Sequence, residues 1–233
     1  SQYFVKPVDS FVAMSRSVLE DLNIFDAKKP RTFCPHPLYD NFGERMDRDE
    51  ALRRLNLDPS CQYLLFFGFI RDYKGLDLLL NAFADERLAS KNVKLIVAGE
   101  FYNNSQRYFD LYDSLALKDR VIWCNDFIPD SKVGECFCAA DVIVQPYKSA
   151  TQSGVTQIAY HFERPMLVTN VGGLSEIVPD GKVGYVVNPD AKAIADALID
   201  FYENDRAASF SDNLRTEKTK YAWSRMVEAV LGK

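Results

Sequence analysis

From residue 62 onward, short apolar runs alternate with longer amphipathic stretches. Six runs rich in β-branched and aromatic residues predict strands. They cover 62–70, 93–99, 120–124, 141–147, 165–170 and 183–187. Because most of these runs are apolar almost without interruption, we expect strands that are buried on both faces, as in a parallel sheet.

The stretches between these runs carry apolar residues at helical spacing, as Leu76, Leu79, Leu80 and Phe83 do in the first. This spacing predicts helices over 75–88, 106–117, 131–140, 154–162 and 191–204. Strands that alternate with helices of this length indicate an α/β fold. The prediction is a doubly wound, Rossmann-like parallel sheet with helices on both faces, covering roughly residues 60–205.

The first 60 residues follow a different pattern. They predict a strand that ends at a capping Ser15, a helix over 17–25, a short strand from Arg31, and a helix over 47–57. Pro35 and Pro37 indicate a connector rather than the interior of an element. We therefore expect residues 1–45 to be the tail of a preceding, truncated N-terminal domain plus a linker, and residues 46–233 to form the main domain.

The last stretch, 219–233, predicts an amphipathic helix with Trp223, Met226, Val227 and Val230 on one side. We expect this side to pack on a neighbouring surface.

Composition and charge narrow the class of function. The chain has 233 residues, 47% of them hydrophobic, and a formal net charge of −5. No general basic field is available for DNA or RNA, so a nucleic-acid partner is not expected. No apolar run reaches the length of a membrane-spanning helix. The expected location is cytoplasmic, and a peripheral contact with the cytoplasmic face of a membrane is compatible with it.

The cysteine pattern indicates reduced thiols. Five cysteines are scattered and lie mostly in apolar runs, which suits core thiols better than a disulfide framework. Cys136 and Cys138 would point to different faces of a helix and no second pair follows, so no metal site is expected. His161 falls inside an apolar helix, where a structural histidine is the favoured interpretation.

Ligands of open parallel sheets bind outside the carboxyl ends of the strands, so the loops that follow the strands are the candidate sites. The loop after strand 62–70 reads "GFIRDYKGL". Gly68 permits a close backbone approach, and Arg71 and Lys74 lie between the strand and a helix that Gly75 opens. Two cations beside helix amides favour an anion site. The alternative is a solvated turn whose cations are incidental.

The loop "SATQSGV" follows strand 141–147. The backbone N–H groups of Gln152, Ser153, Gly154 and Val155 would lie at a helix N-terminus, which favours phosphate binding. A plain N-cap by a hydroxyl residue of this loop is the alternative. A third loop carries Gly172 and Gly173, which permit either a ligand approach or a simple turn.

Together these loops could hold a diphosphate. Micromolar binding needs about −8 kcal/mol, and each hydrogen bond to a charged group contributes roughly 1.5–3 kcal/mol. Arg71, Lys74 and two or three amides would reach that range.

Three segments carry a resemblance to a known family: "FFGFIRDYKGLDLLLNAF", "ADVIVQPYKSATQSGVTQIAYHFERPMLVTNVGGLSEIV" and "DGKVGYVVNPDAKAIADAL". Over about residues 62–200 the chain resembles the retaining, two-Rossmann-domain (GT-B) glycosyltransferases of group 1, or family 4. The resemblance implies the C-terminal, donor-binding half of a GT-B fold, inactive without its N-terminal half. The implied partners are a nucleotide-sugar, with UDP or GDP expected, and a glycan or lipid-linked sugar acceptor held by the missing domain. No cofactor or metal is implied.

The resemblance also implies roles for individual residues. Lys74 would contact the donor diphosphate, and Arg71 is grouped with it as catalytic. The expected donor-binding residues are Gly68, Phe69, Glu100, Phe101, Phe127, Ile128, Gln152, Ser153, Gly154, Val155 and Gln157. The amides of Ser153, Gly154 and Val155 would hold the distal phosphate, and Phe127 and Ile128 would lie near the base. For Phe101 a core position is an equal alternative.

Two departures from the family pattern affect the expected mechanism. Phe69 stands where many relatives have arginine, and Arg71 is expected to serve instead because residues two apart in an extended segment face the same side. The family's paired glutamates are absent, and Gln157 can donate or accept a hydrogen bond but cannot act as a base. The implied transfer is metal-independent and retains configuration, with the leaving diphosphate stabilised by cations and helix amides.

Two other classes remain alternatives. One is a nucleotide- or flavin-binding module of doubly wound fold without chemistry, since fold alone does not fix function. The other is a domain that acts only through protein interaction, using its N-terminal segment and its C-terminal helix.

Overall fold

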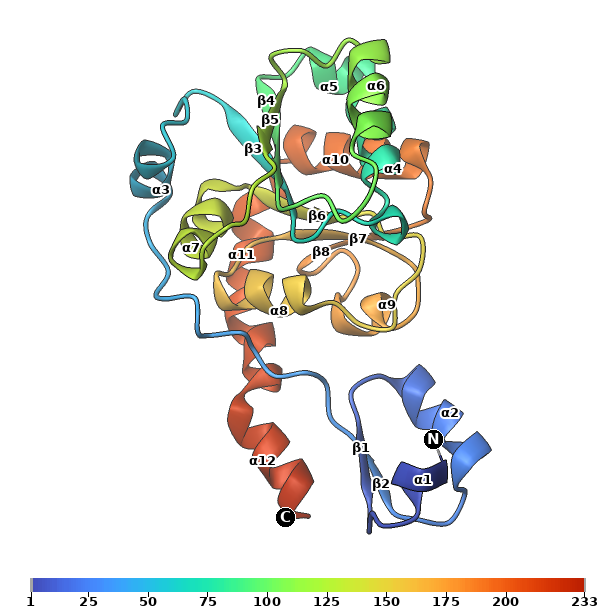
Figure 1. The fold of residues 1–233 in the computed structure, drawn as a ribbon. Coiled ribbons are helices and arrows are strands. Elements are labelled where there is room, and N and C mark those ends of the chain that lie inside the picture. The colour runs from blue at the N-terminus through green and yellow to red at the C-terminus, as the bar shows by residue number, and fades with distance from the viewer. Residues whose placement is uncertain (1, 233) are drawn as a thin grey trace.

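A six-stranded parallel sheet forms the centre of the molecule (Figure 1). The computed structural model describes residues 2–232. The strands, in spatial order, are β5 (Val121–Cys124), β4 (Val93–Ala98), β3 (Gln62–Phe67), β6 (Val142–Gln145), β7 (Met166–Thr169) and β8 (Gly184–Val187). Each lies within a run that predicts a strand, so the predicted parallel sheet is confirmed.

Helices cover both faces of the sheet and enclose two buried clusters, as the doubly wound prediction requires. Side chains of α4, α6 and α10 pack with Leu64, Leu95 and Val144 on one face. Side chains of α3, α7 and α8 pack with Leu65, Ile96 and Ile143 on the other. The bounds are α3 (Arg48–Arg54), α4 (Leu76–Phe83), α6 (Gln106–Ser114), α7 (Asp130–Ala139), α8 (Gly154–His161), α9 (Leu174–Ile177) and α10 (Ala191–Glu203).

The order of the strands reverses at the middle of the sheet. From β3 the chain runs outward to β4 and β5, then returns to β6 beside β3 and runs outward the other way to β7 and β8. Because the loops after β3 and β6 lead to opposite sides, a crevice opens between their carboxyl ends, which is where ligands bind in such sheets. The fold therefore brings the first two candidate loops of the sequence together.

The stretch predicted as one helix over 75–88 is two helices, so that prediction was wrong in one detail. The first, α4, ends at Phe83 with Ala84 as its C-cap, and α5 (Glu86–Ala89) begins after Asp85. The Asp85 side chain accepts a hydrogen bond from Arg87 N, so it caps a new helix rather than continuing the old one. A helix that the pattern did not predict, α11 (Arg206–Glu217), follows α10.

The N-terminal residues form a small separate unit, drawn in blue in Figure 1. It contains α1 (Gln2–Val5), β1 (Phe11–Ala13), α2 (Arg16–Phe25) and β2 (Arg31–Phe33), and the two strands pair in parallel. Ser15 caps α2, as predicted. The backbone N–H of Arg16 donates to Glu176 Oε2 of α9 at 3.0 Å, so this unit touches the main domain.

The linker that follows is fastened to the main domain at several points. Leu38 N donates to Tyr221 O at 2.9 Å, and Trp223 Nε1 donates to Leu38 O at 3.1 Å. His161 Nε2 lies 2.7 Å from Gly43 O, which confirms the structural interpretation of this histidine. The chain closes with η2 (Lys218–Tyr221) and α12 (Trp223–Leu231).

The apolar side of α12 is not covered within the described residues. Trp223 is 50% exposed and Val230 63% exposed. The packing of this helix on a neighbouring surface stays a prediction. Across residues 2–232 no helix combines the length and the apolar character needed to cross a bilayer.

Candidate functional site

Two adjoining cavities lie at the carboxyl ends of β3 and β6. The apolar cavity, of about 260 Å³, is lined by Phe42, Phe67, Gly68, Phe69, Lys74, Gly99, Glu100, Phe127, Ile128, Asp130, Val133 and Val155. The cradle cavity, of about 520 Å³, is lined by Tyr39, Phe42, Phe69, Tyr73, Lys74, Tyr147, Gln152, Ser153, Gly154, Val155 and Ile158. Phe42, Phe69, Lys74 and Val155 border both, so the two cavities form one continuous site.

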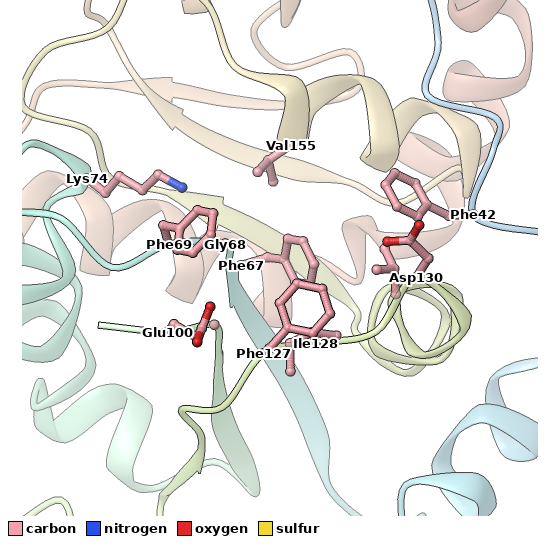
Figure 2. A pocket seen from close by; sticks show the side chains of 12 residues that line it. Phe42, Phe67, Gly68, Phe69, Lys74, Glu100, Phe127, Ile128, Asp130 and Val155 are labelled. Carbon is pink, nitrogen blue, oxygen red and sulfur yellow. The ribbon is translucent and has the colours of Figure 1, made fainter. Parts of the chain in front are cut away.

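Lys74 lies at the junction of the two cavities. It is the last residue of η1 (Asp72–Lys74), a turn that ends where Gly75 adopts a left-handed conformation with φ 69°. A Cβ atom on Gly75 would lie 1.9 Å from Pro146 O, so only glycine lets this turn approach the loop after β6. Figure 2 shows the ammonium extending toward Val155, beside the ring of Phe69.

Glycine also makes room for the Lys74 ammonium. A Cβ on Gly68 would lie 2.9 Å from Lys74 Nζ, and Gly68 itself has φ 95°. Gly99, at the end of β4, approaches so closely that its Cβ would lie 2.4 Å from Gly68 O. These two glycines therefore bring the ends of β3 and β4 together beside the ammonium.

The Lys74 charge is not neutralised by the protein. The residue is 9% exposed, and burial, together with the nearby positive charge of Arg71, lowers the pKa of its ammonium to about 8. Within residues 2–232 it is the one cation that lines either cavity, and no carboxylate contributes to its pKa. An unpaired buried cation is costly, so a site of this kind favours an anionic ligand.

The N-terminus of α8 faces Lys74 from the other side of the cradle cavity. Ser153 is the N-cap, and its Oγ accepts a hydrogen bond from Val155 N at 3.2 Å. The same hydroxyl donates to Gln145 Oε1 at 2.7 Å and lies 3.2 Å from Tyr147 Oη. The N-cap alternative is therefore confirmed, and the cap already uses the Val155 N–H that was predicted to hold the distal phosphate. Phosphate binding by the amides of Ser153 and Gly154 stays a prediction.

The glycine pair Gly172 and Gly173 packs against the backbone of Ala150 and Thr151, which precede α8. A Cβ on Gly172 would lie 1.5 Å from Ala150 O, and one on Gly173 would lie 2.5 Å from Thr151 O. Gly173 N also donates to Thr151 O at 3.2 Å. The pair lets two backbones approach each other, and neither glycine lines the cavities.

Three of the predicted site residues do not line the cavities. The Arg71 guanidinium packs on the Tyr102 ring, 4.1 Å from its centroid. Phe101 lies among the rings of Tyr108, Phe109 and Trp123, which is the core alternative. Gln157 is 1% exposed and its Oε1 is buried without a hydrogen-bond partner.

The sequence pattern missed the contribution of the linker. Tyr39 and Phe42 line the site although they lie far from the loops in sequence. The Tyr39 ring packs so tightly on Gly154 that a Cβ there would lie 2.7 Å from Tyr39 Cε2. The one signal was a pair of aromatic residues in a segment otherwise typical of a connector.

No cluster of three or more histidine, cysteine, aspartate or glutamate residues suited to a metal ion occurs in the part of the chain that the structure describes. The site offers the Lys74 ammonium, helix amides and apolar walls, with the carboxylate residues Glu100 and Asp130 at the lining of the apolar cavity. This combination can hold a molecule with a flat apolar part and an anionic part.

Known proteins resemble this chain in sequence. A model of the family described as "Glycosyl transferases group 1" matches residues 61–204. The D-inositol 3-phosphate glycosyltransferase of Gordonia bronchialis is 26% identical over 197 residues, which make up 79% of this chain and 42% of that protein. The chain thus spans less than half of this relative's length.

Solved structures share the fold. The sucrose-phosphate synthase of Thermosynechococcus elongatus superposes with a TM-score of 0.83 and 21% identity, covering 99% of this chain and 58% of that one. The structure of Anabaena HepE in complex with UDP and glucose gives a TM-score of 0.79 and 16% identity, covering 97% and 64%. None of these matches favours the flavin-module alternative.

Proposed function

The chain belongs to the glycosyl transferases group 1 family, and from this premise we propose that it is the donor-binding part of a retaining glycosyltransferase. The enzyme would transfer a sugar from a nucleoside-diphosphate sugar to an acceptor. The observation that carries the proposal is Lys74, a buried cation without a carboxylate partner between an apolar cavity and a helix N-terminus.

The two cavities match the two ends of such a donor. The apolar cavity, bordered by Phe127 and Ile128, would take the base. The diphosphate would lie between the Lys74 ammonium and the amides of Ser153 and Gly154, and the sugar would occupy the cradle cavity. Lys74 and these amides would together supply most of the roughly −8 kcal/mol that micromolar binding requires.

Catalysis would rest on stabilising the departing diphosphate. Lys74 and the amides of Ser153 and Gly154 would be preorganised for this task because Lys74 is buried and the two amides are held at the N-terminus of α8. Arg71 would join them by leaving the Tyr102 ring, which is exposed and holds it by a cation–π contact alone. Gln157 would serve donor recognition and not as a base, and no metal ion or cofactor would take part.

The remaining parts of the proposal come from the family and its members. UDP or GDP is the proposed nucleotide, with the UDP complex of Anabaena HepE as support for the former. The acceptor would be a glycan or a lipid-linked sugar, held mainly by an N-terminal domain. We place the enzyme in the cytoplasm, in peripheral contact with the membrane.

The test is calorimetric titration of the chain with UDP, GDP and ADP in the absence of metal. We expect one nucleotide to bind, and Lys74→Ala to weaken its binding by about 1.5–3 kcal/mol because a charge-assisted hydrogen bond is lost. Lys192→Ala, an exposed lysine of α10, is the matched control and should bind as the wild type does. Equal nucleotide affinity of the wild type and Lys74→Ala would show that Lys74 does not contact the donor.

A further inference from the structure

A third cavity lies at the opposite end of the strands from the donor site. It measures about 430 Å³ and is lined by Arg45, Met46, Asp47, Arg48 and Arg164, and we name it the arginine cavity. Arg164 lies two residues before the start of β7, and Arg48 pairs with Asp141, which directly precedes β6. The cavity is therefore at the amino ends of these strands, whereas the donor site is at the carboxyl ends.

We propose that the arginine cavity binds a small phosphate-bearing anion at a site separate from the donor site. Three of its five lining residues are arginines, and their guanidinium groups offer planar arrays of N–H donors suited to phosphate oxygens. Met46 is the single apolar lining residue, so a large hydrophobic ligand does not fit the chemistry of the walls.

Arg164 is the one arginine of the cavity that forms no salt bridge among the described residues, since Arg45 pairs with Glu163 and Arg48 with Asp141. Its Nη1 donates to Ala140 O at 3.3 Å, while its Nε is buried without any hydrogen-bond partner among the described residues. Burial lowers the pKa of Arg164, and the charge of Arg45 lowers it further, against the opposing effects of Cys138 and Asp141. An anion in the cavity would offset the repulsion between Arg164 and Arg45.

The carboxylates near the cavity are already engaged. Asp141 accepts from Arg48 Nε at 3.1 Å and from Tyr63 N at 2.6 Å. Asp47 accepts from the backbone N–H of Asp49 at 2.9 Å, as the N-cap of α3.

Glu163 is shared among three cations. Arg45 and Arg215 each lie 3.1 Å from its Oε2, and Lys218 lies 2.8 Å from its Oε1. Cations therefore outnumber carboxylates around the cavity, although the whole chain carries a net charge of −5.

The test measures binding of inorganic phosphate to the Lys74→Ala protein by calorimetry. This substitution removes the side chain that is proposed to bind phosphate in the donor site, so any remaining binding can be assigned to another site. We expect phosphate to bind this protein, and Arg164→Met added to it to weaken binding about tenfold or more. Arg53→Met is the matched control, since Arg53 is on α3, is 73% exposed and does not line the cavity. UDP should not compete with phosphate for the arginine cavity of the Lys74→Ala protein.

Further variants and one further probe keep the result decisive. If Arg164→Met does not fold, Arg45→Gln replaces it, because that side chain is 44% exposed and its loss is tolerable at the surface. Co-sedimentation with vesicles that contain phosphatidic acid tests whether the phosphate group belongs to a lipid. Vesicle binding that is lost in Arg164→Met would support the site and identify a lipid headgroup as its ligand. Phosphate binding that Lys74→Ala abolishes, or that Arg164→Met and Arg45→Gln leave unchanged, would overturn the proposal, as would the absence of binding to both probes.

Discussion

At the scale of one residue, the buried charge of Lys74 is proposed to bind an anion but lowers the stability of the ligand-free fold. Burial and the charge of Arg71 lower its pKa from 10.5 to about 8, so the folded state binds the Lys74 proton less tightly than the unfolded chain does. At pH 7 the group is protonated in both states, and the difference corresponds to a cost of about 3 kcal/mol to the folded state. This cost is relieved as the pH rises from 8 to 10.5, where the unfolded chain still holds the proton.

Lys74→Met is therefore expected to stabilise the ligand-free protein. Methionine has a similar shape without the charge, so urea unfolding at pH 7 should show a gain of about 1–3 kcal/mol. The gain should shrink as the pH approaches 10.5, because the wild-type lysine becomes neutral in the folded state. Lys192→Met should change stability by less than about 0.5 kcal/mol. A loss of stability in Lys74→Met at pH 7 would mean that contacts of the ammonium outweigh its burial.

At the scale of elements, the loop after β6 depends on a close approach from the loop after β7. Gly172 has φ 50°, and its Cβ would lie 1.5 Å from Ala150 O, three residues before Ser153. Any side chain at Gly172 must therefore displace the segment that leads into the N-terminus of α8. The geometry of the proposed phosphate-binding loop therefore depends on Gly172, which lies outside that loop.

Gly172→Ala tests this dependence, with Gly181→Ala as its control. Gly181 has φ 68° but open space around its Cβ position, so its substitution carries only the backbone cost, about 1–2 kcal/mol. Gly172→Ala adds the clash, and we expect at least about 2 kcal/mol more destabilisation in urea and about a tenfold loss of UDP affinity. Similar effects of the two substitutions on both measurements would show that the approach of Gly172 does not shape the cradle.

The elements also show which features a sequence reveals. The strands could be predicted because apolar runs such as "LLFF" and "VIV" need burial on both faces. The break between α4 and α5 depends on a single cap, Asp85, within a continuous apolar pattern. Helix α11 has few buried residues, among them Phe210 and Leu214, so its mostly polar sequence carries little periodic signal.

The candidate site was predicted where it depends on local loops and missed where it depends on distant segments. Lys74 and the "SGV" amides come from the loops at the strand order reversal, so their positions follow from the fold class. Tyr39 and Phe42 reach the site because the linker folds back over α8, which no local pattern encodes. Phe69 lines both cavities, whereas Arg71 lines neither and packs on Tyr102, so its substitution for the missing family arginine and its catalytic role stay predictions.

At the scale of the whole molecule, one carboxylate joins three segments that are distant in sequence. Glu163 lies two residues beyond the end of α8 and is 8% exposed. It pairs with Arg45 of the linker, Arg215 of α11 and Lys218 of η2. Burial alone would raise its pKa, but the hydrogen bonds from Lys218 and Arg215 outweigh it, so the pKa of Glu163 is lowered from 4.5. The linker that carries Tyr39 and Phe42 is held to the domain partly through this group.

Glu163→Gln should loosen that arrangement. The three cations would lose their shared charge, and because their own side chains are partly exposed we expect a loss of about 2 kcal/mol at pH 7. Since the folded-state pKa is below 4.5, the stability that Glu163 confers is present above pH 4.5 and is lost as the pH falls through the folded-state value. Urea unfolding from pH 7 to pH 3 should therefore show a difference between wild type and Glu163→Gln that shrinks in acid. The control is Glu228→Gln, at an exposed glutamate of α12, whose stability should differ little from that of the wild type at any pH. If Glu163→Gln is as stable as the wild type at pH 7, the linker is held by its backbone contacts instead.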